Sequence, residues 1–284
     1  MATITNQAAL SYNGITTLSN IAVGELVEVL TVTKTAADTT YTPGSTKTYA
    51  ISLVNSGAAP FTGLTITDTL GSYAFNNGTL YPLTYVTGSL LYYVNGILQA
   101  TPAIADTAPL TVTGLSVPAG GSAMLVYSAT VNEFAPLGVE DSIVNTVSVT
   151  GGGLAAPVTA TETINASTTP QLSISKSICP ATIAENGTLT YTLTLQNRGN
   201  TAATASDELV ITDTFDPILK DLSVSFNGTV WTEGVHYTYD AATGAFATVT
   251  GALTVPAATY TQDAATGIYT VDPGVSNLVI TGML

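Results

Sequence analysis

The sequence predicts an all-β fold made of two tandem Ig-like β-sandwiches, preceded by an N-terminal arm. Short runs of alternating apolar and polar residues, bounded by Gly, Pro, Asn and Asp, recur along the chain without a convincing helical period. The order of these runs in the first half recurs in the second half. A length of 284 residues is enough for two domains that each bury a core.

Charged side chains are rare in this chain. Only 8% of residues are charged, the net charge is −14, and Lys and Arg together number five. This balance argues against a nucleic-acid partner, because binding to phosphates requires basic patches. Few charges also leave strand edges open to pairing with other chains. No apolar run is long enough to span a membrane, and the first residues lack the basic start and apolar core of a secretory signal.

Residues 1–26 are expected to form an N-terminal donor strand followed by a hinge. Ile4, Asn6, Ala8 and Leu10 share one face of this strand, which has no domain before it in the sequence. The segment after it, bracketed by two glycines, is expected to be the hinge or a second added strand. A disordered tail, or an extra strand on the chain's own first domain, is the alternative.

The first sandwich is expected over residues 27–165 and the second over residues 170–284, with a short polar linker between them. Three strands of the first sandwich have counterparts in the second, and each copy carries an Asn-Gly hairpin signal. The paired strands are 30–35 with 172–177, 48–55 with 190–197, and 64–70 with 209–215, and the hairpin signals are Asn95-Gly96 and Asn227-Gly228.

The closing strand of the first copy has no counterpart in the second, so the second sandwich is expected to be incomplete. In residues 143–149 apolar residues occupy alternate positions, and an Asn lies in the same inward phase. Residues 4–10 share this pattern. We therefore expect the N-terminal strand of one chain to complete the second sandwich of an identical neighbour, giving a head-to-tail homopolymer. Completion by the chain's own N-terminus, giving a closed monomer, is a further alternative.

These motifs resemble the bacterial conserved-repeat surface domain, domain of unknown function eleven. The resemblance covers nearly all of residues 27–284 and rests on a strand ending in Lys-Thr, a Pro-Gly before a Thr-Tyr strand, an Asn-x-Gly turn, an Ile-Thr-Asp-Thr strand and a closing Ile-x-Asn strand. It implies Ig-like sandwiches in a cell-surface or appendage protein. In architecture and mass the chain is also similar to the pilus-like appendage subunits of clostridial spores. Lysis of the mother cell would release such subunits without a secretory signal.

Three polar residues of the first copy, Lys34, Asp68 and Asn145, lie in the inward phase of apolar strands. Because unpaired burial is costly, we expect them to meet. Burial lowers a lysine pKa and raises a carboxyl pKa. The neutral amine can then attack the Asn side-chain carbon and expel ammonia, while the acid stabilises the oxyanion. We expect an intramolecular Lys34–Asn145 isopeptide bond assisted by Asp68, as known in similar Ig-like domains of bacterial pili and adhesins.

The second copy has Lys176 and Asp213 in the same phases, but no matching Asn follows. Asn6 of a neighbouring chain is expected to complete this set through an intermolecular isopeptide bond to Lys176, with Asp213 as the assisting acid. The alternative for both trios is structural: the amines reach water from strand ends, the aspartates cap turns, and the asparagines bond backbone groups.

The remaining residues indicate no enzyme with turnover. His236 is the only histidine and Cys179 the only cysteine, so a His-based triad or metal site and an internal disulfide cannot be built. We expect no cofactor and no metal. Aromatic residues near the hairpin signals leave glycan binding open, although packing explains such residues more often.

The sequence thus predicts a structural subunit of an extracellular bacterial filament, on the cell or spore surface, that assembles by strand donation and is reinforced by Lys–Asn isopeptide bonds. The alternative is an adhesin or carbohydrate-binding module of a larger surface protein. The starting segment favours the filament, because an arbitrary module has no reason to begin with a copy of the strand that its last domain needs.

Overall fold

The computed structural model describes residues 2–284, so Met1 of the predicted arm lies outside the described residues. Apart from one short 3-10 helix, η1 (Ala205–Asp207), the regular elements of this part are β-strands, which confirms the predicted all-β fold. The chain divides into two compact units. The first unit is built from the residues up to Thr39, residues 46–131 and residues 144–163. The second unit is built from residues 40–45, 132–143 and 164–284.

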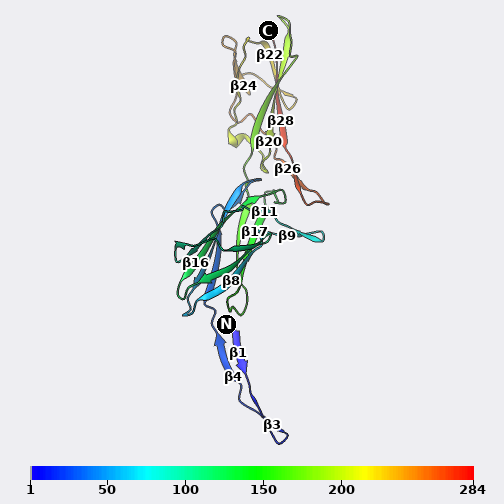
Figure 1. The fold of residues 1–284 in the computed structure, drawn as a ribbon. Coiled ribbons are helices and arrows are strands. Elements are labelled where there is room, and N and C mark those ends of the chain that lie inside the picture. Colours follow the sequence, from blue (N-terminus) through cyan, green and yellow to red (C-terminus); the bar gives the residue numbers. More distant parts are fainter. Residues whose placement is uncertain (1) are drawn as a thin grey trace. The chain divides into compact units, whose positions relative to one another are not determined.

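The N-terminal residues form a folded-back hairpin, in which β1 lies beside β4 (Figure 1) and β2 pairs with β3. Asn13 and Gly14 at the turn have positive φ angles of 47° and 79°, which a two-residue hairpin turn requires. The segment expected to be a hinge is therefore the return half of a hairpin. The strands are β1 (Ala2–Asn6), β2 (Ala9–Tyr12), β3 (Ile15–Leu18) and β4 (Ala22–Leu26).

The first sheet of the first unit has the order β13-β12-β16-β7-β5, and β11 also pairs with β16. Alternate residues of its long strands are buried, as a period of two predicts. The predicted Asn95-Gly96 hairpin is confirmed, because both residues have positive φ between β12 and β13. The strands are β5 (Leu30–Ala36), β7 (Thr46–Asn55), β11 (Leu83–Tyr85), β12 (Leu91–Val94), β13 (Ile97–Leu98) and β16 (Ser122–Val131).

The second sheet packs on the first and has the order β14-β15-β8-β17-β18. Ile51 and Leu53 of β7 and Leu64 of β8 are almost fully buried in the core. Short β6 (Thr40–Tyr41) pairs in parallel with the last two residues of β18, and these paired residues belong to the second unit. The other strands are β8 (Phe61–Asp68), β14 (Ala103–Thr107), β15 (Leu110–Val117), β17 (Ser142–Gly151) and β18 (Val158–Ala166), with a separate hairpin of β9 (Tyr73–Phe75) and β10 (Gly78–Leu80).

The second unit repeats this plan with a smaller second sheet. Its larger sheet has the order β19-β20-β28-β22-β23, its smaller sheet the order β21-β25-β24, and its core is built around Phe215, Phe246 and Leu278. The predicted Asn227-Gly228 hairpin is confirmed between β22 and β23. The strands are β19 (Leu172–Cys179), β20 (Thr188–Asn197), β21 (Thr212–Thr214), β22 (Lys220–Phe226), β23 (Thr229–Val230), β24 (Tyr237–Asp240), β25 (Ala245–Thr248) and β28 (Gly274–Met283), beside a hairpin of β26 (Thr259–Gln262) and β27 (Tyr269–Asp272).

The corresponding strands β8 and β21 differ in length and in partners. β8 has eight residues and pairs with β15 on one edge and β17 on the other. β21 has three residues and, within residues 2–284, pairs only with β25. The strand predicted over 209–215 is thus regular only over 212–214, because one of its edges lacks the ladder that would hold the remaining residues extended.

Candidate functional site: a buried Lys–Asp–Asn cluster and an open sheet face

Lys34, Asp68 and Asn145 come from three strands of the first unit. Lys34 lies on β5 opposite Ile51, and Asp68 is the last residue of β8. Val147 of β17 pairs with Asp68, and Asn145 precedes Val147 by two residues, which places it beside the turn that follows β8. Each of the three residues is at most 4% exposed. The inward phase predicted for them is therefore confirmed.

Asp68 holds the cluster together. The Lys34 amine donates to Oδ2 of Asp68 at 2.7 Å, and the Tyr127 hydroxyl donates to the same oxygen at 2.7 Å. The Leu70 N–H donates to Oδ1 at 3.1 Å. Neither side chain of the Lys34–Asp68 ion pair is exposed to solvent. Hydrogen bonds from the protein thus replace the water that a carboxylate needs.

Asn145 is held through both of its polar atoms. Its Nδ2 donates to the Tyr127 hydroxyl at 3.2 Å, while its Oδ1 accepts from the Thr69 hydroxyl at 3.3 Å and the Gly71 N–H at 3.2 Å. The sequence led us to expect a direct hydrogen bond from Asp68 to the Asn145 side-chain carbonyl, but no such bond joins them among the described residues. Thr69 and Gly71 bind the oxygen instead, and Asp68 is linked to Asn145 through Tyr127.

Burial controls the charge states in this cluster. Desolvation lowers the pKa of Lys34 from 10.5 to about 8, although the Asp68 carboxylate opposes the shift. Burial, reinforced by the Asp68 charge, raises the pKa of Tyr127 well above its ordinary value. The lysine is therefore partly a neutral nucleophile at mildly alkaline pH, whereas the tyrosine keeps its proton and remains a hydrogen-bond donor.

The second unit contains the corresponding ion pair in a more exposed setting. Lys176 donates to Asp213, and their side chains are 39% and 17% exposed. The Lys176 amine also lies 4.4 Å from the centre of the Tyr191 ring. Ile280 pairs with Tyr191 at the position that Tyr127 occupies in the first unit. Among the residues that the structure describes, the second ion pair therefore lacks a counterpart of the Tyr127 hydroxyl.

One apolar row of β19 faces solvent. Leu172, Ile174 and Ile178 are 40%, 56% and 44% exposed, whereas Leu30 and Val32 of the corresponding strand β5 are 5% and 8% exposed. In the first unit the opposite sheet continues past β8 through β17 and β18, but in the second unit, within the described part of the chain, it stops at β21. We call the β19 row, with Lys176 and the adjoining edge of β21, the open face.

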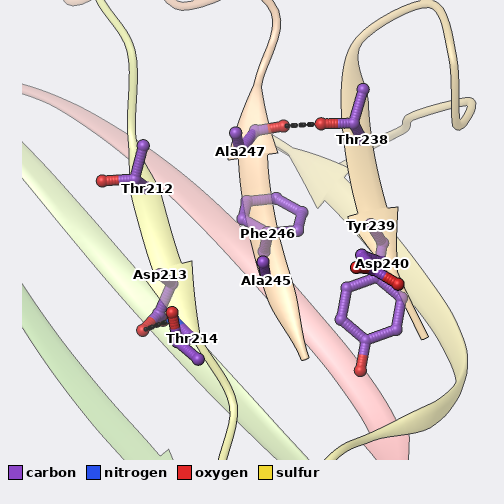
Figure 2. Close-up of a pocket in the computed structure, with 9 residues that line it drawn as sticks. All are labelled: Thr212, Asp213, Thr214, Thr238, Tyr239, Asp240, Ala245, Phe246 and Ala247. Carbon is purple, nitrogen blue, oxygen red and sulfur yellow. Dashed lines mark hydrogen bonds between the residues drawn. The ribbon is translucent and has the colours of Figure 1, made fainter. Parts of the chain in front are cut away.

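Figure 2 shows that β21 forms the border of its sheet, with Thr212, Asp213 and Thr214 lying beside the residues of β25. In the first unit the N–H at the corresponding position, that of Thr69, donates to the carbonyl of Thr146 on β17 at 2.9 Å. The Thr214 N–H instead bonds the Asp213 side chain at 2.9 Å. In the second unit the Asp213 side chain thus accepts the hydrogen bond that a neighbouring strand accepts in the first unit.

The residues predicted to be donated are exposed on the arm. Ile4 and Leu10 are 55% and 67% exposed, and Asn6 and Ala8 also lie at the surface. The strand is interrupted at Gln7 and Ala8, where the Ala8 N–H bonds the Ser19 hydroxyl at 3.0 Å. The arm therefore presents its apolar side chains to solvent in a hairpin rather than in a single extended strand.

Strand phase alone did not indicate Tyr127, Thr69 and Gly71. Tyr127 lies in an inward row of β16 with Leu125 and Ala129, so its burial could have been read from alternation, although its polar partners could not. Thr69 and Gly71 lie in a turn, where alternation gives no information about direction.

Other candidate sites have simpler roles. His236 stacks on Trp231 at 5.3 Å, and Cys179 is a free, exposed cysteine at the end of β19. Within residues 2–284, no group of His, Cys, Asp and Glu is arranged to hold a metal ion. No helix in the same part is long and apolar enough to cross a membrane.

No protein-family model matches the chain, and no curated protein matches it. Solved structures with similarity include BcpA, the major pilin subunit of Bacillus cereus, at a TM-score of 0.37 and 14% identity over 96% of this chain and 73% of that chain. The pilus backbone RrgB from Streptococcus pneumoniae gives 0.35 and 11% over 86% of this chain, which spans 55% of the RrgB length. The collagen adhesin CNA from S. aureus gives 0.31 and 12% over 52% and 55% of the two chains. Such scores establish no common topology, so the function has to be inferred from the geometry of the chain itself.

Proposed function

We propose that the chain is a structural subunit of an extracellular fibre in which the N-terminal strand of one copy completes the second unit of the next. One observation carries this proposal: β5 is buried in the first unit, while the similarly patterned β19 is exposed beside the free edge of β21. A free strand edge accepts another strand through backbone hydrogen bonds, and the adjoining apolar row receives its alternate side chains.

The arm supplies a strand with the required pattern. Residues 4–10 repeat the alternation of β17, the strand that pairs with β8 in the first unit. Donation requires β1 and β2 to leave β4 and β3, and an isolated two-stranded hairpin is only marginally stable in water. Because donor and acceptor surfaces differ, the contact is heterologous and propagates head to tail.

The first unit also supplies the register of the donated strand. There, Val147 of β17 pairs with the last residue of β8. The same register in the second unit places Ala8 opposite Asp213 and Ala9 opposite Thr212. The apolar side chains of the donor then alternate toward the open face, as those of β17 alternate toward the core of the first unit.

Two isopeptide bonds would reinforce this assembly. In each, a lysine amine paired with an aspartate replaces the side-chain nitrogen of an asparagine and releases ammonia. The first unit supports this chemistry through its solvent-excluded amine, acid and amide. The residues are Lys34, Asp68 and Asn145 within the first unit, and Lys176, Asp213 and the Asn6 of a neighbouring copy across the subunit contact.

A disulfide between engineered cysteines tests strand donation and its register. Ala9→Cys and Thr212→Cys are combined in a background of Cys179→Ser and Lys176→Met, which removes other covalent links between copies. Oxidation should give a ladder of disulfide-linked oligomers on non-reducing denaturing gels. Gln7→Cys with Thr212→Cys is the matched control, because it shifts the donor by two residues on the same face and should give little ladder.

Each outcome separates the alternatives. A ladder for the first pair and not for the control supports strand donation. A disulfide formed within single chains indicates self-completion and contradicts a head-to-tail fibre. Absence of a disulfide in both pairs overturns strand donation and favours a surface binding module.

Mass spectrometry tests the covalent part separately. After boiling in detergent and digestion, wild-type protein should yield a joined Lys34–Asn145 peptide that is lighter than its two parts by one ammonia. Lys34→Met should abolish this peptide, and Lys47→Met, at another buried lysine of the same unit, should retain it. Separate, unmodified peptides from folded wild-type protein would contradict the bond.

A further inference from the structure

We infer that Thr69, Gly71 and Tyr127 are catalytic in forming the bond proposed for the first unit. The Thr69 hydroxyl and the Gly71 N–H form an oxyanion site for the Asn145 carbonyl, and Tyr127 passes a proton from Asp68 to the departing ammonia. This inference rests on the proposed isopeptide bond and deepens it, because it assigns the groups that stabilise the transition state.

The oxyanion site has two donors on one oxygen, at 3.3 Å from Thr69 and 3.2 Å from Gly71. Attack on the Asn145 side-chain carbon moves an electron pair onto this oxygen, so donors already aimed at it favour the transition state. The Thr69 oxygen also accepts the Thr146 N–H at 3.0 Å. That bond occupies a lone pair and leaves the Thr69 hydrogen free to point at Asn145.

A tight turn presents the Gly71 N–H. Leu70 and Gly71 have positive φ angles of 51° and 70°, and the Ser72 N–H closes the turn on the Thr69 carbonyl at 3.0 Å. A buried leucine rarely adopts this conformation, and such strain persists where the surrounding structure fixes it. The same turn points the Leu70 N–H at Asp68, so one backbone conformation serves both the acid and the oxyanion site.

Tyr127 connects the acid to the leaving group. Its hydroxyl donates to Asp68 at 2.7 Å and accepts from Nδ2 of Asn145 at 3.2 Å. Nδ2 is the atom that must leave as ammonia and therefore must gain a hydrogen. The hydroxyl is the group that contacts both the proton source and the proton acceptor, which is the geometry of a relay.

The step balances without any co-reactant. The neutral Lys34 amine, whose extra proton has gone to solvent, attacks Cγ of Asn145 and forms the Nζ–Cγ bond. Asp68 takes a proton from the bonded amine and gives it to Tyr127, which gives its own proton to Nδ2. The Cγ–Nδ2 bond then breaks, the carbonyl re-forms, and one ammonia leaves for each isopeptide bond.

The rate of ammonia loss tests these roles. Full-length chain is made by cell-free synthesis, sampled over time into denaturant and weighed intact. Thr69→Val should slow the loss about a hundredfold, because it removes one oxyanion donor. Thr69→Ser keeps the hydroxyl and should restore most of the rate. Tyr127→Phe should also slow the loss about a hundredfold, because it removes the relay.

Tyr92→Phe is the matched control, since Tyr92 is another buried tyrosine of this unit whose hydroxyl bonds a backbone carbonyl. Circular dichroism establishes whether each variant folds. If Tyr127→Phe does not fold, the comparison of Thr69→Val with Thr69→Ser tests the inference. Wild-type rates in folded Thr69→Val and Tyr127→Phe overturn this inference alone. If wild-type protein never loses ammonia, the proposed bond falls as well, while strand donation is still decided by the cysteine pairs.

Discussion

Lys34 and Asp68 are a buried ion pair with no exposed side-chain surface, and such pairs contribute little net stability compared with apolar packing. Removing one partner is costly, because the other charge stays buried. In an Asn145→Ala background, which cannot form the bond, Lys34→Met should lower the free energy of unfolding by about 3–5 kcal/mol in denaturant titrations. Lys47→Met should change it by less than about 1 kcal/mol, since its partner Asp38 is exposed. Equal effects would show that Asp68 finds other compensation.

The pKa of Lys34, lowered to about 8 by burial, predicts how bond formation depends on pH. Asp68, Tyr49, Tyr127 and Glu162 provide the charged and titratable surroundings of the amine. Ammonia release should rise about tenfold per pH unit below this pKa, as neutral amine accumulates, and level off above it. Timed intact-mass measurements from pH 6 to about 10 check this profile. A flat profile would exclude the free amine as the attacking group.

The same pKa shift predicts the pH dependence of stability in the Asn145→Ala variant. The pKa of Lys34 falls from 10.5 to about 8 on folding, so between these values the unfolded chain binds more protons than the folded chain. The free energy of unfolding should therefore rise as pH increases across this window, by at most about 3 kcal/mol, and this gain should be absent below it. Urea titrations across the window measure the effect, and adding Lys34→Met should remove it.

At the scale of elements, β21 should lengthen when it receives a donor. The extended ladder predicted over 209–215 exists only at Thr212–Thr214 because one edge has no partner within the described chain. Amides of residues 209–214 should gain protection from hydrogen exchange in fibres relative to a chain lacking residues 2–13. Amides of β24, on the other border of this sheet, should change little. Unchanged exchange in β21 would place the subunit contact elsewhere.

The sequence allowed the strands and the inward residues to be predicted, because alternation with a period of two reports which side of a strand a residue occupies. Lys34, Asp68 and Asn145 were found in this way. Alternation does not report whether the inward side is covered. The missing counterpart of strand 143–149 predicted an open second sandwich, but it did not indicate that β19 is the strand whose apolar row is exposed. The turn that carries Gly71 was also out of reach, since nothing marks Leu70 for a positive φ. The Asn13-Gly14 pair, by contrast, was an available signal for the arm hairpin.

At the scale of the whole molecule, removal of residues 2–13 should leave monomers that no longer form fibres, seen by electron microscopy and light scattering. A synthetic peptide of these residues should bind the truncated chain and stabilise its second unit, by about 2.7 kcal/mol at a hundred times its Kd. The same peptide with Leu10→Asp is the control and should not stabilise it, because a charge would enter an apolar row. Fibres from the truncated chain would contradict the role of the arm.

The chain enters the first unit through β5 and leaves it through β17 and β18. A covalent link from Lys34 to Asn145 would join the strand of entry to the strand of exit. Tension along a fibre would then pass directly through that link, and the polypeptide loop between the two residues would bear no load. The first unit would behave as an inextensible link under force, and stretching would fall on the arm, the second unit and the contacts between copies.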